Sequence, residues 1–145
     1  MKKFFIISIL VLLCIFSSIP FTYASSTTVI SLSDSKITVN GETISTDTSS
    51  SVYLSSQMNN GGTSTDATSS NIEISNIINI NSAGTYEFSG TLTDGQISVN
   101  ANNIVGEVRI VLNNVNITCK NSPAIFVYCK DTENEDCKVV IETAS

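Results

Sequence analysis

The chain has 145 residues, room for a single domain, and its seven basic and thirteen acidic residues give a formal net charge of −6. This acidic balance excludes the nucleic-acid-binding classes, which need clustered basic side chains. The absence of histidine excludes a Ser-His-Asp triad, a Cys-His pair and zinc held by histidine.

Residues 1–24 have the features of a cleaved signal peptide. Lys2-Lys3 precedes the apolar run Phe4–Phe16, and Thr22-Tyr23-Ala24 offers a small-residue cleavage site. The apolar run is shorter than the roughly 20 residues that a membrane span needs. We therefore predict a secreted or cell-surface protein with no membrane segment in its mature form. Cleavage removes two lysines and leaves residues 25–145 with a net charge of −8.

The stretch from about 43 to 70 is rich in serine and threonine and poor in apolar residues. Such a stretch cannot bury enough apolar surface to offset the cost of ordering the chain. We therefore predict a long loop here and expect the packed core to come from the rest of the mature chain.

Short runs of β-branched and aromatic residues, bounded by Gly, Asn, Asp or Ser, predict strands in the remaining chain. Apolar and polar residues alternate clearly in Ile72-Glu73-Ile74-Ser75 and in Ile97-Ser98-Val99-Asn100. No stretch beyond the signal peptide has a helical period, so the predicted fold class is all-β. The predicted strands are Val29–Leu32, Lys36–Val39, Ile72–Ile80, Tyr86–Ser89, Gln96–Val99, Val108–Leu112, Val115–Thr118, Ala124–Tyr128 and Lys138–Ile141.

Two all-β architectures fit this pattern. Asn40-Gly41 and Asp94-Gly95 are two-residue turns that suit a β-sandwich. Val108–Leu112 and Lys138–Glu142 are similar apolar runs separated by two short strands, as in a parallel β-solenoid with three strands per coil. The pattern favours the solenoid.

The mature chain carries two candidate sites of covalent modification. Cys129 and Cys137 bracket an acidic loop, so we predict that they form a disulfide and that Cys119 is left over. A Cys-only metal site is a weak alternative, because three thiolates have no fourth ligand and no CxxC spacing. Asn116 begins the sequon Asn116-Ile117-Thr118, which is a glycosylation site only in a eukaryotic source.

The segment Ala83–Ala101 (AGTYEFSGTLTDGQISVNA) resembles the signature segment of a family of secreted β-helical carbohydrate-binding domains. Val108–Thr118 and Ser122–Val127 are similar to that family's following coils, and Ile30–Val39 resembles its N-terminal strand region. The resemblance covers most of Ile30–Ile141 and implies a right-handed parallel β-helix of the pectate-lyase type. It also implies binding of plant cell-wall polysaccharide, notably polygalacturonate and cellulose, with bound calcium and no established catalysis.

The resemblance covers only the N-terminal portion of the family domain, which continues through several further coils. We therefore expect residues 25–145 to be the N-terminal part of a β-helical carbohydrate-binding domain and the chain to be an incomplete fragment. A stack of strands that stopped in mid-coil would expose strand edges and apolar side chains.

Calcium is the candidate cofactor, because an acidic protein that binds an acidic polymer needs a bridging cation. Calcium takes carboxylate and amide oxygens at flexible geometry. The candidate calcium ligands, all near predicted turns of the family-like segment, are Asp94, Asn100, Asn102 and Glu107. The alternative is that these side chains hydrogen-bond to the turn backbone.

Aromatic faces combined with amide and carboxylate groups are typical of sugar-binding sites. Strand alternation puts Tyr86 and Phe88 on one face, and likewise Phe126 and Tyr128. We predict that Phe88 and Phe126 lie in the core. Tyr86 and Tyr128 remain candidates for the ligand-binding site.

The predicted function is a secreted, non-catalytic module that binds plant cell-wall polysaccharide. A β-solenoid adhesin is the alternative, because a Ser/Thr-rich segment and a sequon suit a surface protein. A pectate-lyase-like enzyme ranks below both, since that chemistry needs a poised base and calcium. Arg109 is the only arginine, and its position between two apolar residues predicts a solvent-facing surface charge.

Overall fold

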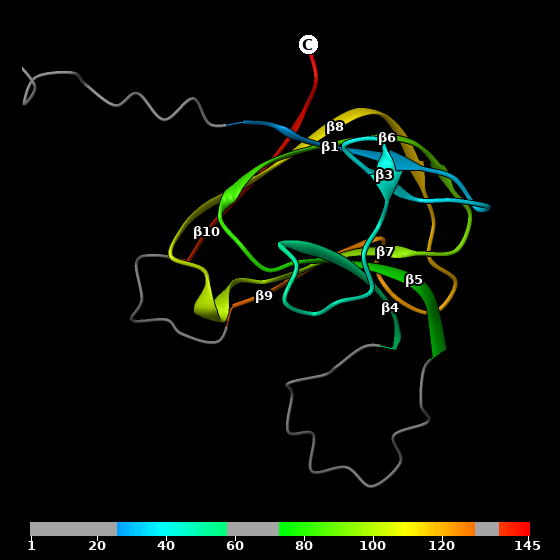
Figure 1. Ribbon diagram of the computed structural model, residues 1–145, viewed down its shortest axis with the longest axis horizontal. Helices are drawn as coiled ribbons and strands as arrows, with labels where there is room; N and C mark the ends of the chain where they lie inside the picture. The colour runs from blue at the N-terminus through cyan, green and yellow to red at the C-terminus, as the bar shows by residue number, and fades with distance from the viewer. Residues whose placement is uncertain (1–25, 58–72, 130–136) are drawn as a thin grey trace, which may run out of the picture.

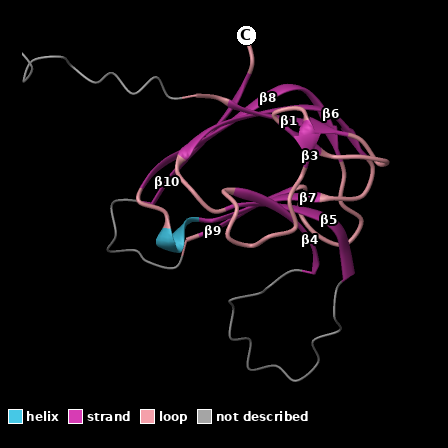
Figure 2. Cartoon of the chain, in the orientation of Figure 1, coloured by secondary structure: helices cyan, strands magenta, loops and turns pink. Residues whose placement is uncertain are grey.

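The computed structural model describes residues 26–57, 73–129 and 137–145, which form two β-sheets (Figure 1). Within these ranges the one helical segment is a turn of 3₁₀ helix, η2 (Ala101–Asn103), which Figure 2 marks in cyan among the strands. The strands in chain order are β1 (Thr28–Leu32), β2 (Thr38–Val39), β3 (Glu42–Thr43), β4 (Val52–Gln57), β5 (Glu73–Ile80), β6 (Gly84–Leu92), β7 (Gln96–Asn100), β8 (Gly106–Ile117), β9 (Ile125–Tyr128) and β10 (Cys137–Thr143). The all-β prediction is confirmed.

Both sheets mix parallel and antiparallel pairs. Sheet A has the strand order β10-β8-β6-β1-β2-β3, and sheet B has the order β4-β5-β7-β9. From β5 to β10 the chain alternates between the sheets, and each strand pairs in parallel with the strand two further along. Figure 1 accordingly has β6 and β8 in the upper layer and β5 and β7 in the lower layer. The pairs β1–β2, β2–β3 and β4–β5 are antiparallel, so a parallel β-helix is not established for the described chain as a whole.

The predicted return of the chain onto its earlier strand is confirmed, because Lys138–Glu142 pair in parallel with Glu107–Val111. Val108–Leu112 and Val115–Thr118, predicted as separate strands, are joined in β8, and the repeating unit has one strand in each sheet. Asn114 lies between them with φ +54°, a left-handed conformation that asparagine tolerates better than most residues. The pairing of β8 with β6 shifts register at this point, so the strand bends without ending.

The Ser/Thr-rich stretch is not a loop throughout. β4 and the end of β3 lie inside the predicted loop, and β4 pairs with β5. Ile44 and Val52 are 6% and 4% exposed, so the few apolar residues of this stretch do contribute to the core. The remainder, residues 58–70, lies outside the described residues.

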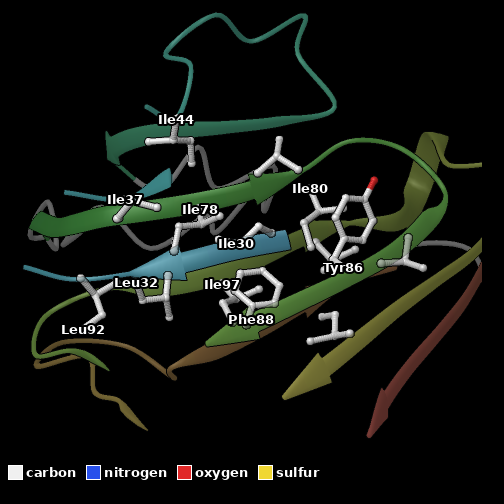
Figure 3. Packing of buried hydrophobic residues seen from close by; sticks show 14 of the residues in the cluster. Ile30, Leu32, Ile37, Ile44, Ile78, Ile80, Tyr86, Phe88, Leu92 and Ile97 are labelled. Carbon is white, nitrogen blue, oxygen red and sulfur yellow. The ribbon is translucent and has the colours of Figure 1, made fainter. Parts of the chain in front are cut away.

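The core lies between the two sheets, as Figure 3 shows with Ile30, Phe88 and Ile97 converging from β1, β6 and β7. These three side chains are fully buried, and each such burial stabilises the fold by roughly 1.5–3 kcal/mol. Phe88 is therefore a core residue, as predicted. Strand alternation turns the intervening residues outward and gives each sheet an outer face.

The predicted signal peptide lies outside the described residues, which begin at Ser26. Within the described ranges, no helix has the length and apolarity needed to cross a membrane.

Candidate functional site

Four side chains form one row across the outer face of sheet B, which we call the cross-strand row. Tyr53 pairs with Asn79, Asn79 with Ser98, and Ser98 with Phe126, on the four strands β4, β5, β7 and β9. Their neighbours along the strands belong to or pack on the core: Val52, Leu54, Ile78, Ile80, Ile97, Val99 and Ile125. Because successive side chains alternate between faces, the row points away from the core. Strand spacing makes it roughly 14 Å long.

All four members of the cross-strand row are partly exposed. Asn79 is held in place by its own amide nitrogen, because Nδ2 donates to Ser55 Oγ at 3.0 Å and to the Ile77 carbonyl oxygen at 3.1 Å. These donations orient the Asn79 amide, whose Oδ1 can accept a hydrogen bond from a bound molecule. The row therefore combines an aromatic side chain at each end with an amide and a hydroxyl between them.

The neighbouring rows of this face differ in accessibility. On one side, Asn100 pairs with Tyr128; Asn100 is exposed and Tyr128 is half-buried. On the other side, Ile77 pairs with Gln96, and these side chains are 1% and 0% exposed. The accessible side chains of this face thus include the cross-strand row together with Asn100 and Tyr128.

Gln96 fixes the start of β9 and so the position of Phe126. Its Nε2 donates to Ser122 Oγ at 2.7 Å and to the Pro123 carbonyl oxygen at 2.8 Å, three and two residues before β9 begins. The backbone bond from Ile97 N to the Ala124 carbonyl oxygen continues the connection. The sequence predicted Gln96 only as a strand residue. Its anchoring role could not be predicted, because its hydrogen-bond partners are distant in the sequence and leave no local signal.

The outer face of sheet A has a different chemistry. Arg109 forms ion pairs with Glu107 at 2.7 Å and with Glu142 at 2.8 Å, and Lys138 pairs with Glu107 at 2.5 Å. Asn113 Nδ2 donates to Glu87 Oε1 at 2.7 Å. The hydrogen bond to Glu142, followed by that to Glu107, raises the pKa of Arg109 above its ordinary value. Its partly exposed position agrees with the predicted surface charge.

Asp94 is engaged in joining two turns. Its carboxylate accepts hydrogen bonds from Lys120 N at 3.3 Å and Lys120 Nζ at 3.1 Å. The side-chain bond to Lys120 lowers the pKa of Asp94, with a further contribution from the backbone bond. Asp34 has the same role after β1, accepting from Thr93 N at 2.8 Å and Thr93 Oγ1 at 2.9 Å. The two sequences Ser31-Leu32-Ser33-Asp34 and Thr91-Leu92-Thr93-Asp94 are alike, and each aspartate accepts hydrogen bonds from the turn that follows the neighbouring strand, β6 or β8.

The four candidate calcium ligands do not share one site. Glu107 lies near the start of β8 and Asp94 follows β6, which places them at opposite ends of the parallel β6–β8 pair. Hydrogen bonding from Lys138, more than from Arg109, lowers the pKa of Glu107. Asn100 Oδ1 accepts from Asn102 N at 3.4 Å, which is the turn-backbone alternative. Among the described side chains, no group of three or more Cys, Asp or Glu could hold a metal ion.

The aromatic candidates divide differently from the prediction. Tyr86 is 2% exposed, and its hydroxyl donates to the Ser82 carbonyl oxygen at 2.8 Å, so its ring is not available to a ligand. Burial raises the pKa of the Tyr86 hydroxyl. Phe126, predicted to be buried, instead points away from the core and is partly exposed, because it is Ile125 that faces inward. Tyr128 shares that outward face and remains a candidate.

The covalent candidates are placed as follows. Cys119 is a free thiol and Cys129 is disulfide-bonded. The side chain of Cys137 lies outside what the structure describes, so the Cys129–Cys137 pairing stays a prediction. Asn116 is exposed on β8, a position accessible to a glycan.

Residues 74–145 match the model of a family described as carbohydrate-binding domain-containing protein. The match supports a carbohydrate-binding domain and begins within β5, so it includes three of the four strands that carry the cross-strand row. No curated protein and no solved structure shows a significant match to the chain.

Proposed function

We propose that this chain is a secreted, non-catalytic module that binds plant cell-wall polysaccharide, with polygalacturonate or cellulose as the ligand. The family match supports carbohydrate as the ligand class and a binding role without catalysis. The observation that carries the proposal within the molecule is the cross-strand row, which joins aromatic side chains with hydrogen-bonding groups on an accessible face. Sugar rings have an apolar face and a hydroxyl rim, so this combination suits them.

We also infer that β5 to β10 are coils of a right-handed parallel β-helix. The alternation between sheets and the parallel pairing of every second strand support this architecture. In such a stack the outer face of each sheet grows by one strand per coil. A polysaccharide is itself a repeating chain, and a face that repeats in steps of roughly 4.8 Å offers it successive contacts.

We expect binding to depend on calcium when the ligand is the acidic polymer, polygalacturonate. A uronate polymer would meet a mature chain of net charge −8, and a divalent cation would reduce that repulsion. Because the four candidate ligands lie apart, a bridging ion would be held jointly by the protein and by carboxylates of the polymer.

The test is retention of the secreted chain on insoluble cellulose and on polygalacturonate gel, each with and without a calcium chelator. We expect retention on at least one of the two, and retention on polygalacturonate should fall with the chelator and recover with calcium. No retention on any polysaccharide would contradict the proposal and favour the adhesin alternative.

A further inference from the structure

We propose that the cross-strand row is the glycan-binding site and that it takes an uncharged pyranose chain, lying across the strands of sheet B. This inference rests on the proposed function and narrows its ligand class. It follows from the position, spacing and lack of charge of Tyr53, Asn79, Ser98 and Phe126.

The two outer faces of the fold differ in charge. Sheet A presents Glu87, Glu107, Arg109, Lys138 and Glu142, and four of these five are paired with each other. The cross-strand row and the adjoining Asn100 and Tyr128 contain no ionisable carboxylate or amine. An acidic sugar on this face would lose water around its carboxylate without gaining a cationic partner. An uncharged sugar has no charged group to desolvate and avoids this cost.

The geometry of the row suits an extended chain. Tyr53 and Phe126 lie at its two ends, roughly 14 Å apart, and offer two separate apolar contacts. Asn79 and Ser98 lie between them and provide hydrogen-bonding groups for sugar hydroxyls. Because the four residues come from four strands, the bound chain runs perpendicular to the strands, along the direction in which the sheet is built.

The row is also rigid, which favours binding. The backbones of β5, β7 and β9 are held by parallel pairing, Asn79 by its donated hydrogen bonds, and the start of β9 by Gln96. Side chains that are already ordered lose less conformational entropy when a ligand binds.

The test measures binding of cellohexaose, an uncharged soluble oligomer, and of a galacturonate hexamer to the secreted chain and its variants by calorimetry. Phe126→Ala should weaken cellohexaose binding by about tenfold or more, as the loss of a key aromatic contact does in other interfaces. Tyr53→Leu, at the other end of the row, should also weaken it, while a chelator should leave it unchanged. The matched control is Asn113→Ala on sheet A, which removes an exposed amide and its bond to Glu87 and should leave binding unchanged.

The outcomes separate this inference from the function on which it rests. Unchanged cellohexaose binding in folded Phe126→Ala and Tyr53→Leu would overturn the site but not the carbohydrate-binding function. Binding of the galacturonate hexamer alone would overturn the uncharged ligand class. Loss of binding in Asn113→Ala would move the site to sheet A. If Phe126→Ala loses the circular dichroism signal of its strands, the variant has not folded. The binding measured for Tyr53→Leu then decides whether the cross-strand row is the site. A native chain that binds neither oligomer nor any polysaccharide would overturn both proposals.

Discussion

Replacing Gly90 with alanine would introduce a methyl group where the backbone of β1 already lies. Gly90 has φ +96° and pairs with Leu32 across the β1–β6 interface. A Cβ atom at this position would lie 2.3 Å from the Leu32 carbonyl oxygen and 3.3 Å from the Leu32 carbonyl carbon. Backbone atoms of a paired strand cannot rotate away as a flexible side chain can, so β1 would have to shift.

The expected loss has two contributions. A left-handed backbone costs an alanine about 1–2 kcal/mol relative to glycine. Displacing β1 from its parallel partner adds strain, which brings the total to about 2–4 kcal/mol. Gly41→Ala is the matched control, since Gly41 has a similar φ of +86° but no atom within 4 Å of the added Cβ. Gly41→Ala should therefore show only the backbone cost.

Urea denaturation of the two variants and the native chain, followed by circular dichroism, measures the difference. With a slope of about 2 kcal/mol per molar urea, Gly90→Ala should unfold roughly 0.5–1 M earlier than Gly41→Ala. Equal midpoints for the two variants would contradict this prediction, because the contact with Leu32 would then carry no cost.

Three further predictions concern the core, the turn contacts and the anchor of β9. Phe88→Ala, at a fully buried position, should lower the free energy of unfolding by about 3–5 kcal/mol in the same urea assay, and a loss under about 1 kcal/mol would contradict the core assignment. The hydrogen bonds that Thr93 donates lower the pKa of Asp34 below its ordinary value of 3.8. The ionised carboxylate therefore stabilises the fold above pH 3.8, and this stabilisation is lost as the pH falls through the pKa of Asp34 in the folded chain. From about pH 5 downward, the melting temperature should therefore fall less in Asp34→Asn than in the native chain, and parallel pH profiles would contradict this. Gln96→Ala should lower the free energy of unfolding by about 1–3 kcal/mol, because the hydrogen bonds to Ser122 and Pro123 are lost. The same variant should weaken glycan binding, and an unchanged free energy of unfolding would contradict the anchoring role.

Local sequence patterns predicted most of the strands, because alternation depends only on neighbouring residues. Glu73-Ile74-Ser75 and Ile97-Ser98-Val99 lie in β5 and β7 as expected. β4 was missed because its short apolar run, Val52-Tyr53-Leu54, lies in a polar stretch and is stabilised by pairing with β5. That pairing is remote in sequence and leaves no local signal.

The candidate site was less predictable from sequence. The side chains of the cross-strand row come from four strands, and only the register brings Tyr53 and Asn79 beside Ser98 and Phe126. Alternation correctly put Phe126 and Tyr128 on one face, but sequence could not tell which face of β9 meets the core. The acidic candidates failed to converge for the same reason, because turn positions near in sequence lie at opposite ends of parallel strands.

An NMR titration of the isotopically labelled chain with cellohexaose would locate the glycan-binding site most directly. If the cross-strand row binds the glycan, the backbone amide signals of Asn79, Ser98 and Phe126 should shift as the oligomer is added, while those of Glu87 and Arg109 stay in place. Shifts confined to Glu87, Arg109 and their neighbours on sheet A would contradict this assignment.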